Sequence, residues 1–232
     1  MGPVHRSTRS IRASDPSCSA STTTWLSGSP SGAVAYGVYA WAVSNPAVAQ
    51  TLYQSPLRWV VIFAPLLFVF GLSAGINRMQ PATARMLFLV YAAVMGLSLS
   101  SIFLVYTGVS IARTFFITAA SFGALSLYGY TTKRDLSGFG SFLMMGLIGI
   151  ILASIVNLFL QSSAMQFAIS VLGVLLFAGL TAFDTQKLKN TYEMVAGDAV
   201  AAGRASILGA LQLYLDFINL FMFLLQFMGR RD

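Results

Sequence analysis

The sequence predicts an all-α integral membrane protein with seven transmembrane helices. Hydrophobic residues make up 56% of its 232 residues and charged residues only 9%, whereas a soluble domain carries about 25% charged residues. Long apolar runs recur along the chain. A helical run of about 20 residues, rising about 1.5 Å per residue, covers a hydrocarbon core of roughly 30 Å. Composition and run length together therefore indicate a protein of the bilayer.

Each expected helix is an apolar run bounded by charged or turn-forming residues. The first opens near Ala33 and is short, because Pro46 interrupts it, so we expect it to end near Val48 or Leu52. The other six expected helices are residues 59–76, 86–106, 111–130, 139–160, 165–183 and 205–228. Residues 187–204 form the longest expected internal loop, which can partly extend the helices on either side.

The first 31 residues differ from the rest of the chain. They hold 13 Ser or Thr, three Arg and one Asp, without apolar periodicity. A Ser-rich, Arg-bearing, acid-poor segment is typical of an organelle transit peptide, but a disordered or mis-started leader is the interpretation that we favour. We therefore expect a doubtful leader at residues 1–31 and a seven-helix transmembrane domain at residues 32–232.

Basic residues predict the orientation of the seven spans. Ten of the 14 Lys and Arg residues fall on the side of the N-terminus and the even-numbered loops, and four fall on the other side. Without the leader the counts are seven and four. Because Lys and Arg accumulate in cytoplasmic loops, this asymmetry predicts a cytoplasmic N-terminus.

Residue types that are scarce or absent exclude several functions. Cys18 is the only cysteine and His5 the only histidine, which excludes an intrachain disulfide, a thiolate metal site and histidine-dependent catalysis. No phosphate-binding Gly-Lys-Ser/Thr motif occurs. The basic residues form no stripe interleaved with aromatic residues, so we expect no nucleic-acid partner. We expect no enzymatic activity.

Two carboxylates interrupt the most apolar part of the chain, Asp184 and Asp216. An ionised Asp at the centre of a membrane helix costs about 2.5–3.5 kcal/mol on insertion scales, so it persists where it faces protein or water. On a helical wheel, Asp216 falls within roughly 80° of Gln212, Asn219 and Gln226. One polar stripe on an apolar helix indicates that the last helix lies inside a bundle.

Asp184 lies nearer a membrane edge, three residues before Lys187, where a solvated interfacial carboxylate is the simpler interpretation. Two Asp residues on consecutive antiparallel helices can meet, however. Like carboxylates in contact hold one proton between them and also attract a hard cation such as calcium. Such a pair is a candidate pH-sensitive gate.

The residues around these carboxylates resemble a known family. Residues 183–187, Phe-Asp-Thr-Gln-Lys, and residues 213–221, Leu-Tyr-Leu-Asp-Phe-Ile-Asn-Leu-Phe, are similar to motifs of the Bax inhibitor-1 family, specifically its bacterial branch. The likeness extends over roughly residues 33–232. It implies a seven-helix bundle with the last helix central, and a pH-sensing dyad formed by Asp184 and Asp216.

The resemblance also implies a function and a place. In the family the dyad controls a cytoprotective calcium leak, and some bacterial members modulate a membrane-bound protease. For this chain it implies the bacterial cytoplasmic (inner) membrane, with the mitochondrial inner membrane as the alternative.

The leading hypothesis is a pH-sensitive cation leak, most plausibly for calcium. Asp184 and Asp216, supported by Gln212 and Asn219, offer too few oxygens for a tight calcium site, which takes about six to eight, so we expect weak calcium binding and no cofactor beyond the transported calcium or protons. Arg78 is a candidate salt-bridge partner of Asp184, although a membrane-edge anchor explains it as well.

Two other functions stay open at this stage. One is a membrane-embedded regulator that binds a membrane protease or another integral membrane protein. The other is proton-coupled cation exchange, because a carboxylate pair that loads a cation as it releases a proton has the same sequence pattern. Under every hypothesis the lipid bilayer is a partner.

Overall fold

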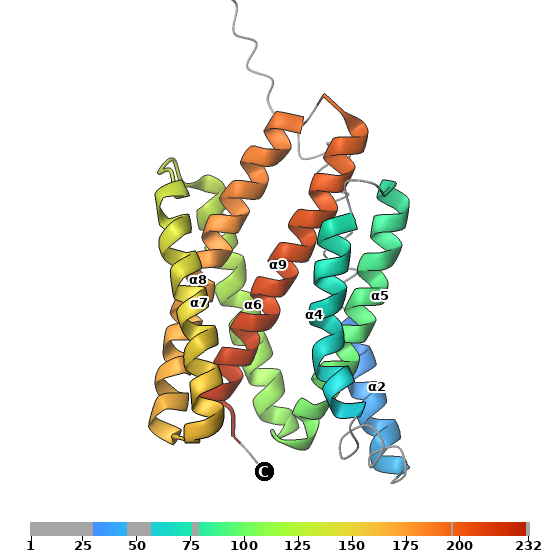
Figure 1. Ribbon diagram of the computed structural model, residues 1–232, viewed down its shortest axis with the longest axis vertical. Helices are drawn as coiled ribbons and strands as arrows, with labels where there is room; N and C mark the ends of the chain where they lie inside the picture. The colour runs from blue at the N-terminus through green and yellow to red at the C-terminus, as the bar shows by residue number, and fades with distance from the viewer. Residues whose placement is uncertain (1–29, 46–56, 76–78, 196, 231–232) are drawn as a thin grey trace, which may run out of the picture.

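The computed structural model describes residues 30–45, 57–75, 79–195 and 197–230. Within them the chain forms seven α-helices and one 3-10 helix, and no strand. Consecutive α-helices run in opposite directions in a single bundle, and α9 crosses its centre diagonally (Figure 1). The elements are α2 (Pro30–Ser44), α4 (Leu57–Gly75), α5 (Pro81–Leu99), η3 (Ser100–Leu104), α6 (Gly108–Thr131), α7 (Ser137–Leu160), α8 (Ser163–Val195) and α9 (Ala199–Met228).

Five helical segments are long and apolar enough to cross a membrane: Pro81–Leu104, Gly108–Thr131, Ser137–Leu160, Ser163–Val195 and Ala199–Met228. α2 has 15 residues, which at about 1.5 Å per residue falls short of a hydrocarbon core of roughly 30 Å. The chain is therefore an all-helical membrane protein, and the count of seven spans stays a prediction.

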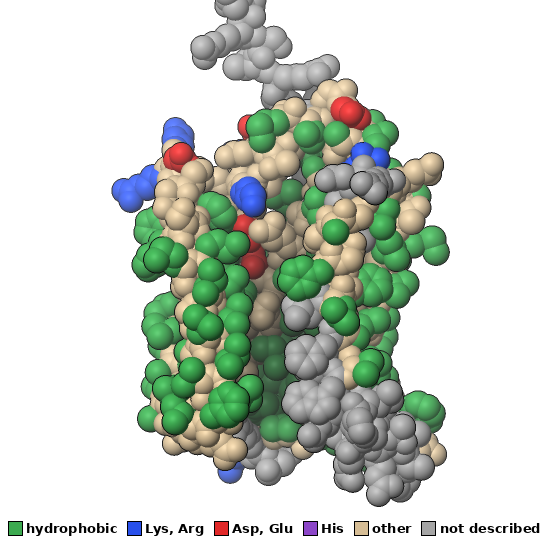
Figure 2. Space-filling model, in the orientation of Figure 1, with side chains coloured by type: hydrophobic (Ala, Val, Ile, Leu, Met, Phe, Trp, Pro, Cys, Tyr) green, Lys and Arg blue, Asp and Glu red, His purple; other side chains and the backbone are tan. Residues whose placement is uncertain are grey.

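The outer surface of the bundle is apolar. Large hydrophobic side chains of α7 point outward, among them Phe142, Met145 and Phe159. Figure 2 shows hydrophobic side chains over the height of the bundle and most of the visible charged side chains at its upper end. An apolar exterior with charges at the ends is the distribution that a bilayer requires.

The first helix ends earlier than the sequence suggested. The expectation of an end near Val48 or Leu52 is wrong, because α2 ends at Ser44 and Asn45 is already non-helical. The physical reason is that Pro46 disfavours the α conformation of the residue before it. The leader, residues 1–29 in particular, lies outside the described residues.

α5 begins five residues before its expected start at residue 86. Pro81, which lies between the helices expected at residues 59–76 and 86–106, is the first helical residue, a position where the missing N–H of proline has no cost. Arg204 Nε donates to the carbonyl oxygen of Met79, 2.9 Å away, and so connects α9 to the residues just before α5.

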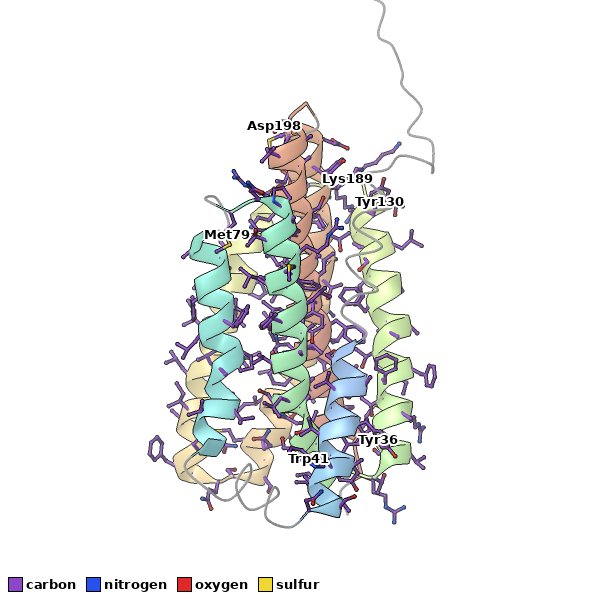
Figure 3. All side chains as sticks on the ribbon, turned by 90° about the vertical axis from the view of Figure 1, so that its right-hand side faces the viewer. Tyr36, Trp41, Met79, Tyr130, Lys189 and Asp198 are labelled. Carbon is purple, nitrogen blue, oxygen red and sulfur yellow. The ribbon has the colours of Figure 1, made fainter. Side chains whose placement is uncertain are left out.

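The expected loop at residues 187–204 is helical over most of its length. α8 continues to Val195 and α9 begins at Ala199. Asp198 caps α9, since its Oδ1 accepts from the backbone N–H of Val200 and of Ala201 at 2.8 and 3.1 Å. Figure 3 shows Asp198 at the tip of this α8–α9 hairpin, beyond the ends of the other helices. The prediction failed because charged residues end the apolar run but do not end the helix, which continues to Val195.

α9 is the centre of the packing. It contributes to all three clusters of buried hydrophobic residues: Ile207, Leu211, Tyr214 and Ile218 to the first; Leu213, Leu220 and Leu224 to the second; Phe221 and Leu225 to the third. These clusters join it to α5, α6, α7 and α8. The expectation of a central last helix agrees with this arrangement.

Candidate functional site

The two carboxylates of the last helices meet inside the bundle. Asp184 on α8 and Asp216 on α9 are 5% and 4% exposed, and their side chains face each other within hydrogen-bonding range. Asp184 Oδ1 and Asp216 Oδ2 find no hydrogen-bond donor among the described residues. Because an ionised carboxylate is only an acceptor, two buried carboxyl groups this close together are stabilised by a shared proton or by a cation.

The geometry that allows this contact is the early start of α9. α9 begins at Ala199, within the expected loop and before the start expected at residue 205, and runs diagonally across the bundle (Figure 1). This course brings Asp216 to the level of Asp184 on α8.

The surroundings of the two carboxyl groups differ. Gln212, one turn before Asp216 on α9, and Lys187 on α8 both lie close enough to Asp184 to stabilise its carboxylate electrostatically. Among the described residues, the interacting side chain found for Asp216 is Asp184 itself. Asp184 is therefore the better stabilised carboxylate, and Asp216 depends on Asp184.

The pair lines a large cavity between α7, α8 and α9. Its volume is about 1190 Å³, and its lining includes Asp184, Asp216 and Lys187 at one end. The four polar residues of the α9 stripe, Gln212, Asp216, Asn219 and Gln226, all line it, as the helical wheel predicted. Figure 2 shows the hollow over α9, with acidic side chains in its upper half and hydrophobic side chains below them.

Of the three supporting residues that the sequence suggested, one lies at the carboxylate pair, one lines the cavity, and one lies outside the described residues. Gln212 reaches the pair. Asn219 lines the cavity, but its Nδ2 donates to the carbonyl oxygen of Leu215 on its own helix, 2.8 Å away. Arg78 lies outside the described residues, so its pairing with Asp184 stays a prediction.

Sequence reasoning missed the role of Gln186, next to Asp184 in the family motif. Its buried side chain accepts from the backbone N–H of Leu136 and donates to the carbonyl oxygen of Arg134, both at 2.8 Å. Lys189, one turn further, donates to the carbonyl oxygen of Tyr130 at 3.1 Å and lies 5.0 Å from the centre of the Tyr130 ring (Figure 3).

The site offers few ligands for a tightly held metal ion. In the part of the chain that the structure describes, no group of three or more His, Cys, Asp or Glu side chains gathers. Two carboxylates with the carbonyl oxygen of Gln212 give fewer oxygens than the six to eight or so that calcium prefers. The arrangement can hold a proton, or a hard cation weakly.

A second polar cluster lies at the other end of the cavity, formed by Asn157, Gln166 and Gln226 from three helices. The sequence marked Gln226 as part of the α9 stripe, but nothing in it connected this residue with Gln166.

Comparisons with known proteins agree with these motifs. The family model described as "Inhibitor of apoptosis-promoting Bax1" matches residues 22–232. The chain is 53% identical over 195 residues to the inner membrane protein YbhL of Escherichia coli, covering 83% of each chain. It is 51% identical over 208 residues to an uncharacterized protein of Caulobacter vibrioides, covering 85% of this chain and 83% of that one.

A protein of Rickettsia prowazekii, also uncharacterized, is 50% identical over 189 residues, covering 82% of this chain and 80% of that one. The family match covers nearly the whole described bundle, including both carboxylates, and these relatives are bacterial. The chain therefore belongs to the Bax inhibitor-1 family, and its similarity to bacterial relatives agrees with the bacterial branch.

Proposed function

We propose that this protein is a pH-sensitive cation leak, with calcium as the main cation, gated by Asp184 and Asp216. The observation that carries the proposal is the buried pair of carboxyl groups, whose oxygens Asp184 Oδ1 and Asp216 Oδ2 have no donor among the described residues and border a cavity of about 1190 Å³. Because this carboxyl pair takes up either a proton or a cation, its state depends both on the pH and on the cation concentration.

The two occupants have opposite effects on the bundle. A shared proton joins the carboxyl groups by a hydrogen bond and holds α8 against α9. Without that proton two like charges repel across the helix contact, or attract a divalent cation from the cavity. Few oxygen ligands mean weak binding, which suits passage rather than storage. The protein needs no cofactor for this and performs no catalysis.

The test is calcium flux into dye-loaded proteoliposomes between about pH 5 and 8. We expect a flux in the wild type that changes with pH, and a flux without that pH dependence in Asp184→Asn and in Asp216→Asn. Asp135→Asn is the matched control, because Asp135 lies in the loop before α7 and is exposed. Wild-type flux no greater than that of empty liposomes at every pH would rule out the leak.

The same protein is a candidate regulator of a membrane protease or of another integral protein. The observation that favours this second function is the α8–α9 hairpin, which exposes Met194 (78%) and Val200 (48%) near its tip. Under this hypothesis Met194→Ser and Val200→Ser weaken binding of a purified partner protease, whereas Asp216→Asn leaves that binding intact. The leak hypothesis predicts the reverse sensitivity for calcium flux.

We propose the bacterial cytoplasmic membrane as its location, with the N-terminus in the cytoplasm. The support is the name of the Escherichia coli relative, an inner membrane protein, and the excess of Lys and Arg on the side of the N-terminus. A cytoprotective role would follow from control of calcium entry.

A further inference from the structure

The end of the cavity opposite the carboxylates carries three amide side chains bonded in a row. Asn157 Nδ2 donates to Gln166 Oε1 at 3.0 Å, and Gln166 Nε2 donates to Gln226 Oε1 at 2.8 Å. We call these three residues the amide cluster. Asn157 lies in the last turn of α7, Gln166 in the first turn of α8 and Gln226 in the last turn of α9, so the cluster links three helices at one end of the bundle.

The amide cluster and the carboxylate pair border one cavity. Gln166 and Gln226 line it together with Asp184 and Asp216. Gln226 follows Asp216 by ten residues on α9, which corresponds to about 15 Å along the helix axis. The cavity therefore has a charged end and a neutral polar end on the same face of α9.

Apolar packing lies immediately beside the amide cluster. Phe223, one turn before Gln226, stacks on Phe177 of α8 with ring centres 5.7 Å apart, and its ring fills the space that a Cβ at Gly173 would take. Ser170 Oγ donates to the carbonyl oxygen of Gln166 at 2.8 Å. Helix contact and amide hydrogen bonds together join α7, α8 and α9 at this end of the cavity.

We propose that the amide cluster closes the ion path at the end opposite the carboxylate pair, and that a cation leaving the cavity passes the amide oxygens of Gln166 and Gln226, which line it, while Asn157 holds Gln166 in place. This inference rests on the proposed leak. Carbonyl oxygens of Asn and Gln are ordinary ligands of hard cations. In the closed state Gln166 Oε1 and Gln226 Oε1 accept from the neighbouring side-chain amides, and Asn157 Oδ1 accepts from the backbone N–H of Ser162 at 3.0 Å. Passage therefore requires the hydrogen bonds to Gln166 and Gln226 to open.

The first test shortens or removes the side chains of the amide cluster. Gln226→Asn and Gln166→Asn each remove one methylene and break an amide contact, and Gln226→Ala removes the amide altogether. We expect calcium flux several-fold above wild type, with its pH dependence retained because the carboxylate pair is intact. Gln161→Asn is the matched control, since Gln161 is an exposed amide at the same end of the bundle and has φ 49°, which Asn tolerates.

A second readout does not depend on ion flux. Ser154 lines the cavity, and its Oγ donates only to Ile150 of its own helix, 2.7 Å away, so Ser154→Cys is a nearly isosteric probe in a Cys18→Ser background. A charged thiol reagent is added to spheroplasts or to inverted membrane vesicles. We expect labelling from one membrane face in the otherwise unchanged protein, and from both faces when Gln226→Ala or Gln226→Asn is added.

Calcium flux and thiol labelling together show which of two proposals is wrong: that the protein conducts calcium, or that the amide cluster closes this end of the cavity. If no variant conducts calcium but the Gln226 variants admit the reagent from the second face, the leak is wrong and the closure stands. If folded Gln226 variants conduct as the wild type does, or less, and are labelled from one face only, the closure is wrong, whatever the wild type conducts. A cluster that only packs helices would lower thermal stability and leave both readouts unchanged.

Discussion

At the scale of single residues, the two carboxylates of the site have unequal support. Asp184 has Gln212 and Lys187 nearby, while Asp216 relies on Asp184. Each is buried and borders the same cavity. What replaces Asp216 therefore decides whether Asp184 keeps a partner.

Asp216→Asn and Asp216→Leu are expected to differ in stability. The amide of Asn can donate to Asp184 where the shared proton does, so its free energy of unfolding should stay within about 1 kcal/mol of the wild type. Leu leaves Asp184 buried without that partner, at a cost of about 1–3 kcal/mol. Thermal unfolding in detergent near neutral pH measures both, and equal losses for the two variants would contradict the pairing.

Asp135, in the loop before α7, gives a pH dependence that is independent of the site. The hydroxyl and the backbone N–H of Ser137 hold the pKa of the Asp135 carboxyl below its usual range, with Oδ1 2.9 Å from that backbone nitrogen. A pKa lowered by folding adds stability above the unfolded value of about 3.9, and this stability disappears as the pH falls through the folded value.

Wild type should therefore be slightly more stable than Asp135→Asn near neutral pH, and the difference should vanish in acid. The effect is small because Asp135 is exposed and water screens its charge. Paired thermal unfolding curves at neutral and acidic pH measure it. A difference that persists below about pH 3 would mean that charge is not its cause.

At the scale of helices, close contact between α6 and α8 sets the level of Asp184. A Cβ built at Gly129 of α6 would meet the backbone of Ala182, with the carbonyl carbon 2.9 Å away, and Ala182 lies two residues before Asp184. A Cβ at Gly123, two turns earlier on α6, would meet nothing within 4 Å. The two glycines therefore provide a matched pair of substitutions.

Gly129→Ala should destabilise the protein by about 1–3 kcal/mol, because backbone cannot yield as a flexible side chain does. Gly123→Ala should be neutral or stabilising by up to about 1 kcal/mol, since alanine favours the helix. Thermal unfolding compares them directly. If the leak is real, Gly129→Ala should also shift its pH dependence, because α8 is displaced beside Asp184; an unchanged profile in a destabilised variant would separate packing from gating.

At the scale of the whole molecule, charge is distributed unequally between the two ends of the bundle. Since consecutive helices run in opposite directions, each described Lys or Arg can be assigned to an end. Six lie towards the end with the α8–α9 hairpin, and three towards the other. These are Arg85, Lys133, Arg134, Lys187, Lys189 and Arg204 at the hairpin end, and Arg58, Arg113 and Arg230 at the opposite end.

This asymmetry predicts that the α8–α9 hairpin is cytoplasmic and that the C-terminus faces outward. A reporter that is active only outside the cytoplasm should be active when fused after residue 232, and inactive when inserted between Thr132 and Leu136. The opposite pattern would invert the orientation, although the bundle itself would be unchanged.

Local sequence predicted most of the helices because their signals are local. Apolar runs gave α4, α6 and α7 to within three residues, and a cluster of polar residues on one face predicted the inward side of α9. The predicted helix boundaries were wrong where the local signal was ambiguous. A proline such as Pro81 is compatible with a turn and also with the first position of a helix. The charged residues after Lys187 are compatible with a loop and also with a helix that leaves the bilayer.

The sequence by itself determined the membrane class, the family motif and the polar face of the last helix, since hydropathy and periodicity depend on neighbours along the chain. Only the tertiary structure decided that Asp184 meets Asp216, that Gln186 holds the loop before α7, and that Gln166 bonds to Gln226 across 60 positions. Those contacts depend on how far α9 extends and how it tilts against α8, and packing of whole helices sets both.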